Sequence, residues 1–175
     1  MPNAKTYLLV TCALAALILG CEKKDDASVK KRPGQPDYVH PKDEAAMNRA
    51  IKKARETQKT FVAALQRPKP GARNFAVKKG FPTPDGGIEH IWIGNPKWDG
   101  AQFRGTVDND PVDTNAVQLG DAVTVKPDEL SDWMYVDGKI LVGGYTLRVL
   151  HFQSTPEEQR KFTQESGMEV PPIDF

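Results

Sequence analysis

Two carboxylates and one histidine are the side chains of this chain that could act together as a general acid and base. Glu89 and His90 are adjacent, and Asp132 follows further along the chain. A histidine with a carboxylate partner can transfer protons near neutral pH, so one hypothesis is a small hydrolase that uses His90 with Asp132 or Glu89. Strand alternation puts Glu89 and His90 on opposite faces, which argues against their joint action. The alternative is that His90 is hydrogen-bonded structurally.

A second kind of chemistry is stacking against a sugar or a peptide. The aromatic side chains in the strand-rich part of the chain that could do this are Trp92, Trp98, Trp133, Tyr135 and Tyr145. Large aromatics also fill the core of a small sheet, so both interpretations stay open. Trp98, next to Lys97 and Asp99 in a predicted loop, is the best candidate for an exposed contact.

The sequence offers little support for metal or cofactor chemistry. The acidic stretch at 108–113 lacks the glycine and the terminal glutamate of a calcium loop. The three histidines, His40, His90 and His151, are too dispersed to indicate metal ligation. The GxSxG, phosphate-loop, HExxH and dinucleotide-binding motifs are all absent. We therefore expect no metal and no cofactor.

The N-terminal segment resembles the signal peptide of a bacterial lipoprotein. Lys5 precedes an apolar run from Tyr7 to Gly20, which is shorter than the roughly 20 residues of a membrane-spanning helix. A small residue then stands directly before Cys21, as in a lipobox. We expect cleavage before Cys21, lipidation of its thiol and attachment to the cell envelope facing the periplasm. Glu22 slightly favours the outer membrane, because an aspartate there would resemble the inner-membrane retention signal.

This N-terminal segment also limits the chemistry and the partners of the mature protein. Cys12 would leave with the signal and Cys21 would carry the lipid, so no free thiol or disulfide would remain. Lys and Arg number 24 against 23 Asp and Glu, and loss of Lys5 would balance the charges. A balanced surface does not attract nucleic acid. The expected partners are the membrane, through the lipid on Cys21, and an unknown envelope protein or glycan.

The composition divides the chain into four parts. Residues 1–20 are the predicted signal peptide. Residues 21–41 are charged, contain several prolines and bury too little apolar surface to fold alone, which predicts a flexible tether. Residues 42–151 form the predicted folded domain, and residues 152–175 form a C-terminal helical extension.

The predicted elements of the folded part begin with an amphipathic helix at 43–66, for which Asp43 is the N-cap. From residue 74 onward the apolar residues recur at every second position, which is typical of strands. The strand candidates are 74–81, 88–94, 102–108, 122–126, 132–136 and 139–151. Asp137-Gly138 predicts a tight hairpin, and Gly143-Gly144 a bulge in the last strand.

A capping box at 155–158 then begins a short helix that ends at Gly167. We therefore expect an α+β fold. Its N-terminal amphipathic helix packs on a small, strongly bent antiparallel sheet or partial barrel, and a short C-terminal helix follows.

Several short groups of residues, taken together in order, carry a family resemblance. They are 75–78 (FAVK), 89–93 (EHIWI), 103–105 (FRG), 120–123 (GDAV), 131–135 (SDWMY) and 143–146 (GGYT). The chain resembles the bacterial family catalogued as domain of unknown function 2314, over roughly residues 42–150. The resemblance implies a shared fold and no established activity.

The leading functional hypothesis is a lipid-anchored, non-catalytic binding or interaction module of the cell envelope. The anchor, the tether and the absence of enzyme motifs favour it. The hydrolase that uses His90 is the first alternative. A protein that protects the cell by blocking a toxin is the second alternative, and it depends on analogy alone.

Overall fold

A six-stranded antiparallel sheet is the centre of the structure. The computed structural model describes residues 29–30, 38–39 and 43–174. The strands of the large sheet lie in the order β6-β5-β4-β3-β7-β8, and all neighbouring pairs are antiparallel. They are β3 (Ala72–Pro82), β4 (Ile88–Trp98), β5 (Phe103–Val107), β6 (Ala122–Val125), β7 (Leu130–Asp137) and β8 (Ile140–Gly143). A separate short ladder pairs β1 (Val29–Lys30) with β2 (Tyr38–Val39).

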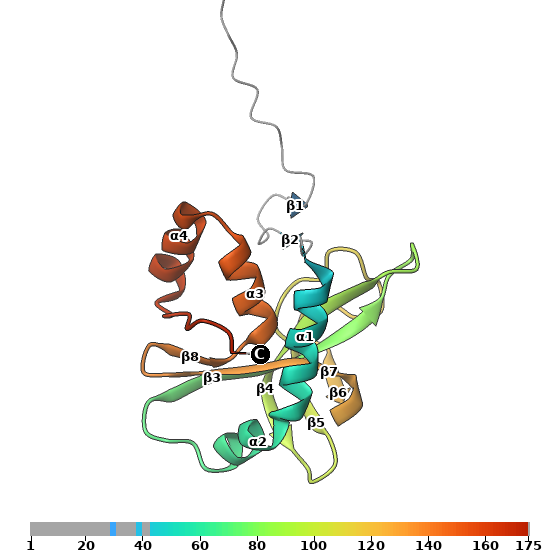
Figure 1. Cartoon of the computed structure of the whole chain (residues 1–175). Helices are drawn as coiled ribbons and strands as arrows, with labels where there is room; N and C mark the ends of the chain where they lie inside the picture. The colour runs from blue at the N-terminus through green and yellow to red at the C-terminus, as the bar shows by residue number, and fades with distance from the viewer. Residues whose placement is uncertain (1–28, 31–37, 40–42, 175) are drawn as a thin grey trace, which may run out of the picture.

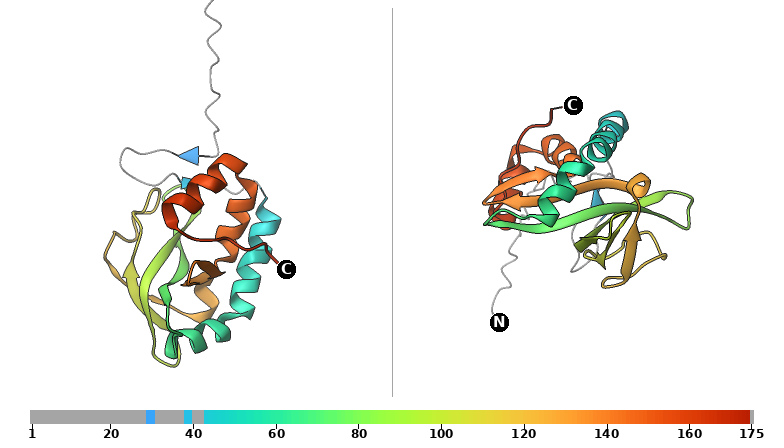
Figure 2. Two further views of the ribbon diagram at one scale, coloured as in Figure 1. Left: turned by 90° about the vertical axis from the view of Figure 1, so that its left-hand side faces the viewer. Right: turned by 90° about the horizontal axis from the view of Figure 1, so that it is seen from below.

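Helices flank the large sheet in sequence. Within the described residues they are α1 (Glu44–Glu56), α2 (Gln58–Gln66), α3 (Tyr145–Gln153) and α4 (Pro156–Ser166), and a 3-10 turn at Pro127–Glu129 leads into β7. Helices α1 and α3 lie side by side (Figures 1 and 2). Ala46 and Ala50 of α1 pack against Val149 of α3. Small alanine side chains allow this close approach of the two helices.

The main core lies between the sheet and the first two helices. Phe61 of α2 is fully buried, and its ring lies 5.2 Å from the ring of Trp133 and 5.7 Å from that of Phe103. The other buried members of this cluster are Ala54, Val77, Phe81, Ile91, Ile93, Val107, Val125, Leu130 and Tyr135. Because side chains alternate along a strand, every second side chain of β3 and β4 lies on the opposite face of the sheet, away from this core.

The predicted fold class was wrong. We expected one N-terminal helix on a strongly bent sheet or partial barrel, with one short C-terminal helix. The sheet is open, with β6 and β8 at its two edges, and both α3 and α4 follow the strands. Apart from β1 and β2, the region before residue 43 lies outside the described residues, and this region includes the predicted signal peptide and Cys21.

The main difference from the prediction is at Gly143 and Gly144, where the expected strand 139–151 ends. Both glycines have positive φ, 71° and 61°, and turn the chain from β8 into α3. A Cβ atom on Gly143 would lie 2.3 Å from the carbonyl oxygen of Trp133, so this position requires glycine. The residues of α3 include β-branched and aromatic types, which are typical of strands and explain the wrong prediction.

The predicted helix at 43–66 is divided at Thr57 into α1 and α2. The indole Nε1 of Trp133 donates to the carbonyl of Ala54 at 2.9 Å and to the hydroxyl of Thr57 at 3.2 Å. In an uninterrupted helix that carbonyl would accept the amide four residues later. We attribute the division to this competing contact from β7.

Candidate functional site

Three adjacent strands bring Trp92, Lys78 and Asp132 into one row. Lys78 of β3 lies opposite Trp92 of β4 and opposite Asp132 of β7. Directly opposed residues share a face of the sheet, and His90, two residues before Trp92, lies on the same face. His90 is opposite Gly80, where a Cβ atom would lie 3.3 Å from its ring, so the glycine leaves room for the imidazole.

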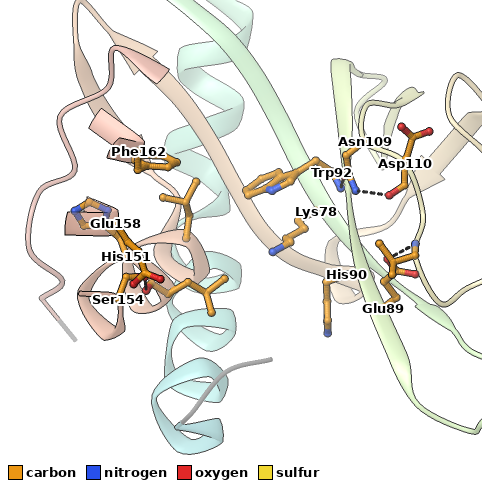
Figure 3. Close-up of a pocket in the computed structure, with 13 residues that line it drawn as sticks. Lys78, Glu89, His90, Trp92, Asn109, Asp110, His151, Ser154, Glu158 and Phe162 are labelled. Atoms are coloured by element: carbon orange, nitrogen blue, oxygen red, sulfur yellow. Dashed lines mark hydrogen bonds between the residues drawn. The ribbon is translucent and has the colours of Figure 1, made fainter. Parts of the chain in front are cut away.

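This face of the sheet is one wall of a pocket of about 510 Å³. Lys78, His90 and Trp92 are on the strand side, and His151, Glu158 and Phe162 of α3 and α4 are on the opposite side (Figure 3). The volume lies within the roughly 300–1,000 Å³ of small-molecule sites. The apolar part of the lining consists of Trp92, Val112, Leu147, Leu150 and Phe162.

Asp132 connects β7 to the start of α3. Its fully buried carboxylate accepts four hydrogen bonds: from the amides of Trp133, Tyr145 and Thr146, and from the Thr146 hydroxyl. Burial raises the pKa of Asp132, although the bonds from Thr146 and the charge of Lys78 act in the opposite direction. Gly144, at the N-cap of α3, has no side chain to cap the helix, so Asp132 supplies the cap.

Lys78 places a desolvated ammonium group beside the pocket. Its Nζ lies 5.0 Å from the centre of the Trp92 ring and 3.4 Å from the Thr146 hydroxyl. Burial lowers the pKa of Lys78, and the nearby Asp132 partly opposes this effect. Within the described part of the chain, no carboxylate oxygen lies within 4.0 Å of this ammonium group.

His90 is neutral at physiological pH. Burial, together with the positive charges of Lys78 and Arg55, lowers its pKa to about 4. Among the described residues, its buried Nδ1 finds no hydrogen-bond partner. Within the part of the chain that the structure describes, His90 is therefore not hydrogen-bonded to Asp132 or to Glu89, the two carboxylates predicted as its partners.

Glu89 holds a loop against the sheet. Its side chain is buried and accepts hydrogen bonds of 2.7–2.8 Å from the backbone amides of Val112, Asp113 and Thr114. These contacts position the segment between β5 and β6, from which Asn109, Asp110 and Val112 reach the pocket. The carboxylate is thus occupied by amide donors, which fixes one rim of the pocket.

Of the aromatic candidates, Trp92 is the one that lines the pocket. Trp98 is half-buried and packs on Phe103, with ring centres 4.7 Å apart. Trp133 and Tyr135 are buried in the main core. Tyr145 packs edge-on against Trp133 at 5.7 Å.

Sequence reasoning missed Lys78, His151 and Phe162 as neighbours of this site. Lys78 stands in a strand that alternates as expected, and nothing in that pattern marks a buried ammonium group. His151 and Phe162 come from α3 and α4 and form an edge-on ring contact at 5.5 Å. Because residues 139–151 were predicted to form a strand, neither α3 nor the wall of the pocket that it forms could be predicted.

Two further observations concern the described residues alone. No group of three or more His, Cys, Asp or Glu side chains among them could hold a metal ion. Likewise, none of the helices that the structure describes is both long and apolar enough to cross a membrane.

The fold and the pocket define a small domain with an open six-stranded antiparallel sheet and a cavity lined by its C-terminal helices. The chain belongs to the family described as an uncharacterized protein conserved in bacteria (DUF2314), which matches residues 44–170. The match extends past residue 150 and includes α4, so both helices that line the pocket are part of the family domain.

Two relatives are similar over most of this domain. The uncharacterized protein YegJ of Escherichia coli (strain K12) is 35% identical over 116 residues, which are 66% of this chain and 74% of that protein. A putative ankyrin repeat protein of Neisseria meningitidis serogroup B, NMB1133/NMB1171, is 37% identical over 142 residues. That match covers 75% of this chain and 54% of the Neisseria protein. No solved structure matches the chain.

Proposed function

We propose that this protein is a lipid-anchored, non-catalytic binding module of the bacterial envelope that holds a small organic molecule in the pocket between β4 and helices α3 and α4. The observation that carries the proposal is the pocket itself. Its volume of about 510 Å³ suits a small ligand, and Trp92, Leu147, Leu150 and Phe162 supply apolar surface. Lys78 and His90 add the few polar groups that orient a ligand in such sites.

The Trp92 ring supports a binding role for this pocket, because an aromatic face offers a large contact area at a small cost in side-chain entropy. Its backbone amide donates to the side chain of Asn109 at 2.8 Å, which joins the strand to the loop on the pocket rim. The wall of the pocket is therefore preorganised, and less binding energy is spent on ordering it.

The pocket is tested with the fluorescent dye 8-anilinonaphthalene-1-sulfonate and the full-length protein. Leu147→Trp adds bulk inside the pocket. Ile88→Trp is the matched control, because Ile88 is 63% exposed and does not line the pocket. We expect saturable dye binding that weakens at least tenfold in Leu147→Trp and is unchanged in Ile88→Trp. Equal affinities in all three proteins would refute a binding role for this pocket.

The proposed envelope location is supported by the lipobox-like segment that ends at Cys21. Metabolic labelling of cells with an alkyne-bearing palmitate, followed by membrane fractionation, tests it. The wild-type chain should carry the label and sediment with the outer membrane. The Cys21→Ser variant should carry none. Label on the Cys21→Ser variant, or an unlabelled wild-type chain, would contradict the anchor.

A further inference from the structure

We propose that the occupant of the pocket is an amphipathic organic anion, with its charged group against Lys78 and its apolar part on Trp92, Leu150 and Phe162. This inference rests on the proposed function, since it names the ligand class of the same pocket. A pocket of this kind selects its ligand by the sign of the charge.

Lys78 has hydrogen-bonding capacity that the described residues do not use. An ammonium group has three donors, and the described protein atoms offer it one acceptor, the Thr146 hydroxyl at 3.4 Å. The nearby Asp132 carboxylate already accepts four hydrogen bonds. A desolvated donor without an acceptor is costly, and a charge-assisted bond to a ligand anion removes that cost.

The charges around the strand wall of the pocket also favour an anion beside Lys78. The positive charges of Lys78 and Arg55 both act on His90 and lower its pKa. The carboxylate of Glu89 is matched by three amide donors. Glu158 is exposed, on the opposite wall, and bonds to Thr155 in the capping box of α4. Asp110 places a further carboxylate on the loop rim of the pocket, whereas Lys78 is the cation on the strand wall itself. The part of the strand wall around Lys78 therefore favours a negative group.

The apolar lining of the pocket favours a ligand with an organic part as well as a charge. Helices α3 and α4 contribute Leu147, Leu150 and Phe162 to the lining, and Figure 3 shows Phe162 across the pocket from Lys78. A small inorganic anion would leave this apolar surface uncovered, whereas a chain or ring attached to the anion would bury it. His90, which is neutral, lines the pocket on the same side as Lys78 and does not oppose an anion there.

The experiment compares two dyes that differ by one charged group. N-phenyl-1-naphthylamine is 8-anilinonaphthalene-1-sulfonate without the sulfonate. We expect the sulfonate dye to bind the full-length protein at least tenfold more tightly than the neutral dye. Lys78→Met should abolish this preference. Lys97→Met is the matched control, because it removes a lysine from the exposed part of the same sheet and should retain the preference.

The outcomes separate this inference from the proposed function. If both dyes bind wild-type protein equally and Leu147→Trp weakens both, the anion selectivity is refuted while the binding pocket stands. If Leu147→Trp affects neither dye, both proposals fail. The wild-type comparison needs no variant, so a Lys78→Met chain that fails to fold leaves the test intact.

Competition identifies the source of the anion. Displacement of the bound sulfonate dye by decanoate would indicate a free organic acid, and displacement by phosphatidylglycerol vesicles alone would indicate a lipid headgroup. Both results support an amphipathic anion. Displacement by decanol as effective as that by decanoate would overturn the proposal.

Discussion

The carboxylate of Asp132 accepts two hydrogen bonds from Thr146, one from the backbone amide at 2.8 Å and one from the side-chain hydroxyl at 2.6 Å. This contact joins β7 to the first turn of α3, 14 residues later in the chain. Since α3 forms the wall of the pocket opposite Lys78, the position of that wall depends on a buried helix cap.

The cap predicts strong and coupled losses of stability. Asp132→Asn should lower the free energy of unfolding by about 2–4 kcal/mol, because it removes a buried, multiply bonded carboxylate. Thr146→Val should cost about 1 kcal/mol through the lost hydroxyl. Urea denaturation of both single variants and the double variant measures the coupling. Losses that simply add would show that the two residues do not act as one unit.

We expect the protein to lose stability in acid, because His90 is buried in its neutral form. Its pKa is about 4 in the folded protein against 6.5 for an unperturbed histidine, so the unfolded chain takes up the proton first as the pH falls. The contribution of neutral His90 is therefore complete above pH 6.5 and is lost as the pH falls towards 4. Between pH 6.5 and pH 4 the free energy of unfolding of the wild type should fall by roughly 2–3 kcal/mol more than that of His90→Gln. Parallel stability curves for the two proteins would contradict the burial of a neutral imidazole.

Gly143 predicts a steric requirement at the entry to α3. Gly143→Ala would place a methyl group 2.3 Å from the carbonyl oxygen of Trp133, at a φ of 71°. Gly138→Ala is the control, because its φ is 62° and its Cβ would meet nothing within 4 Å. Gly138→Ala should cost about 1–2 kcal/mol from backbone strain alone, and Gly143→Ala clearly more. Similar melting temperatures for both variants would contradict the close approach.

Parts of this fold with purely local causes could be predicted from the sequence. Thr155 and Glu158 form the expected reciprocal cap at the start of α4, and Gly167 ends that helix with a φ of 66°. The β7–β8 hairpin is also present, although Asp137 pairs with Ile140 and the turn residues are Gly138 and Lys139. In each case neighbouring residues supply the whole signal.

The rest depends on contacts between distant residues. α3 begins where it does because Asp132, on β7, caps it, and α1 ends where it does because the Trp133 indole donates to Ala54. Neither contact leaves a periodic pattern in α1 or α3. The pocket combines residues of β3 and β4 with those of α3 and α4, so the wrong strand prediction for 139–151 also hid the site.

The most direct test of the central claim follows the three tryptophans separately, since the chain contains Trp92, Trp98 and Trp133. Protein labelled with 5-fluorotryptophan should give one fluorine resonance for each, assigned with single Trp→Phe variants. Titration with 8-anilinonaphthalene-1-sulfonate should shift the resonance of Trp92, which lines the pocket, and leave those of Trp98 and Trp133 in place. A saturable shift at Trp98 or Trp133 with Trp92 unchanged, or no shift at any of them, would contradict ligand binding in this pocket.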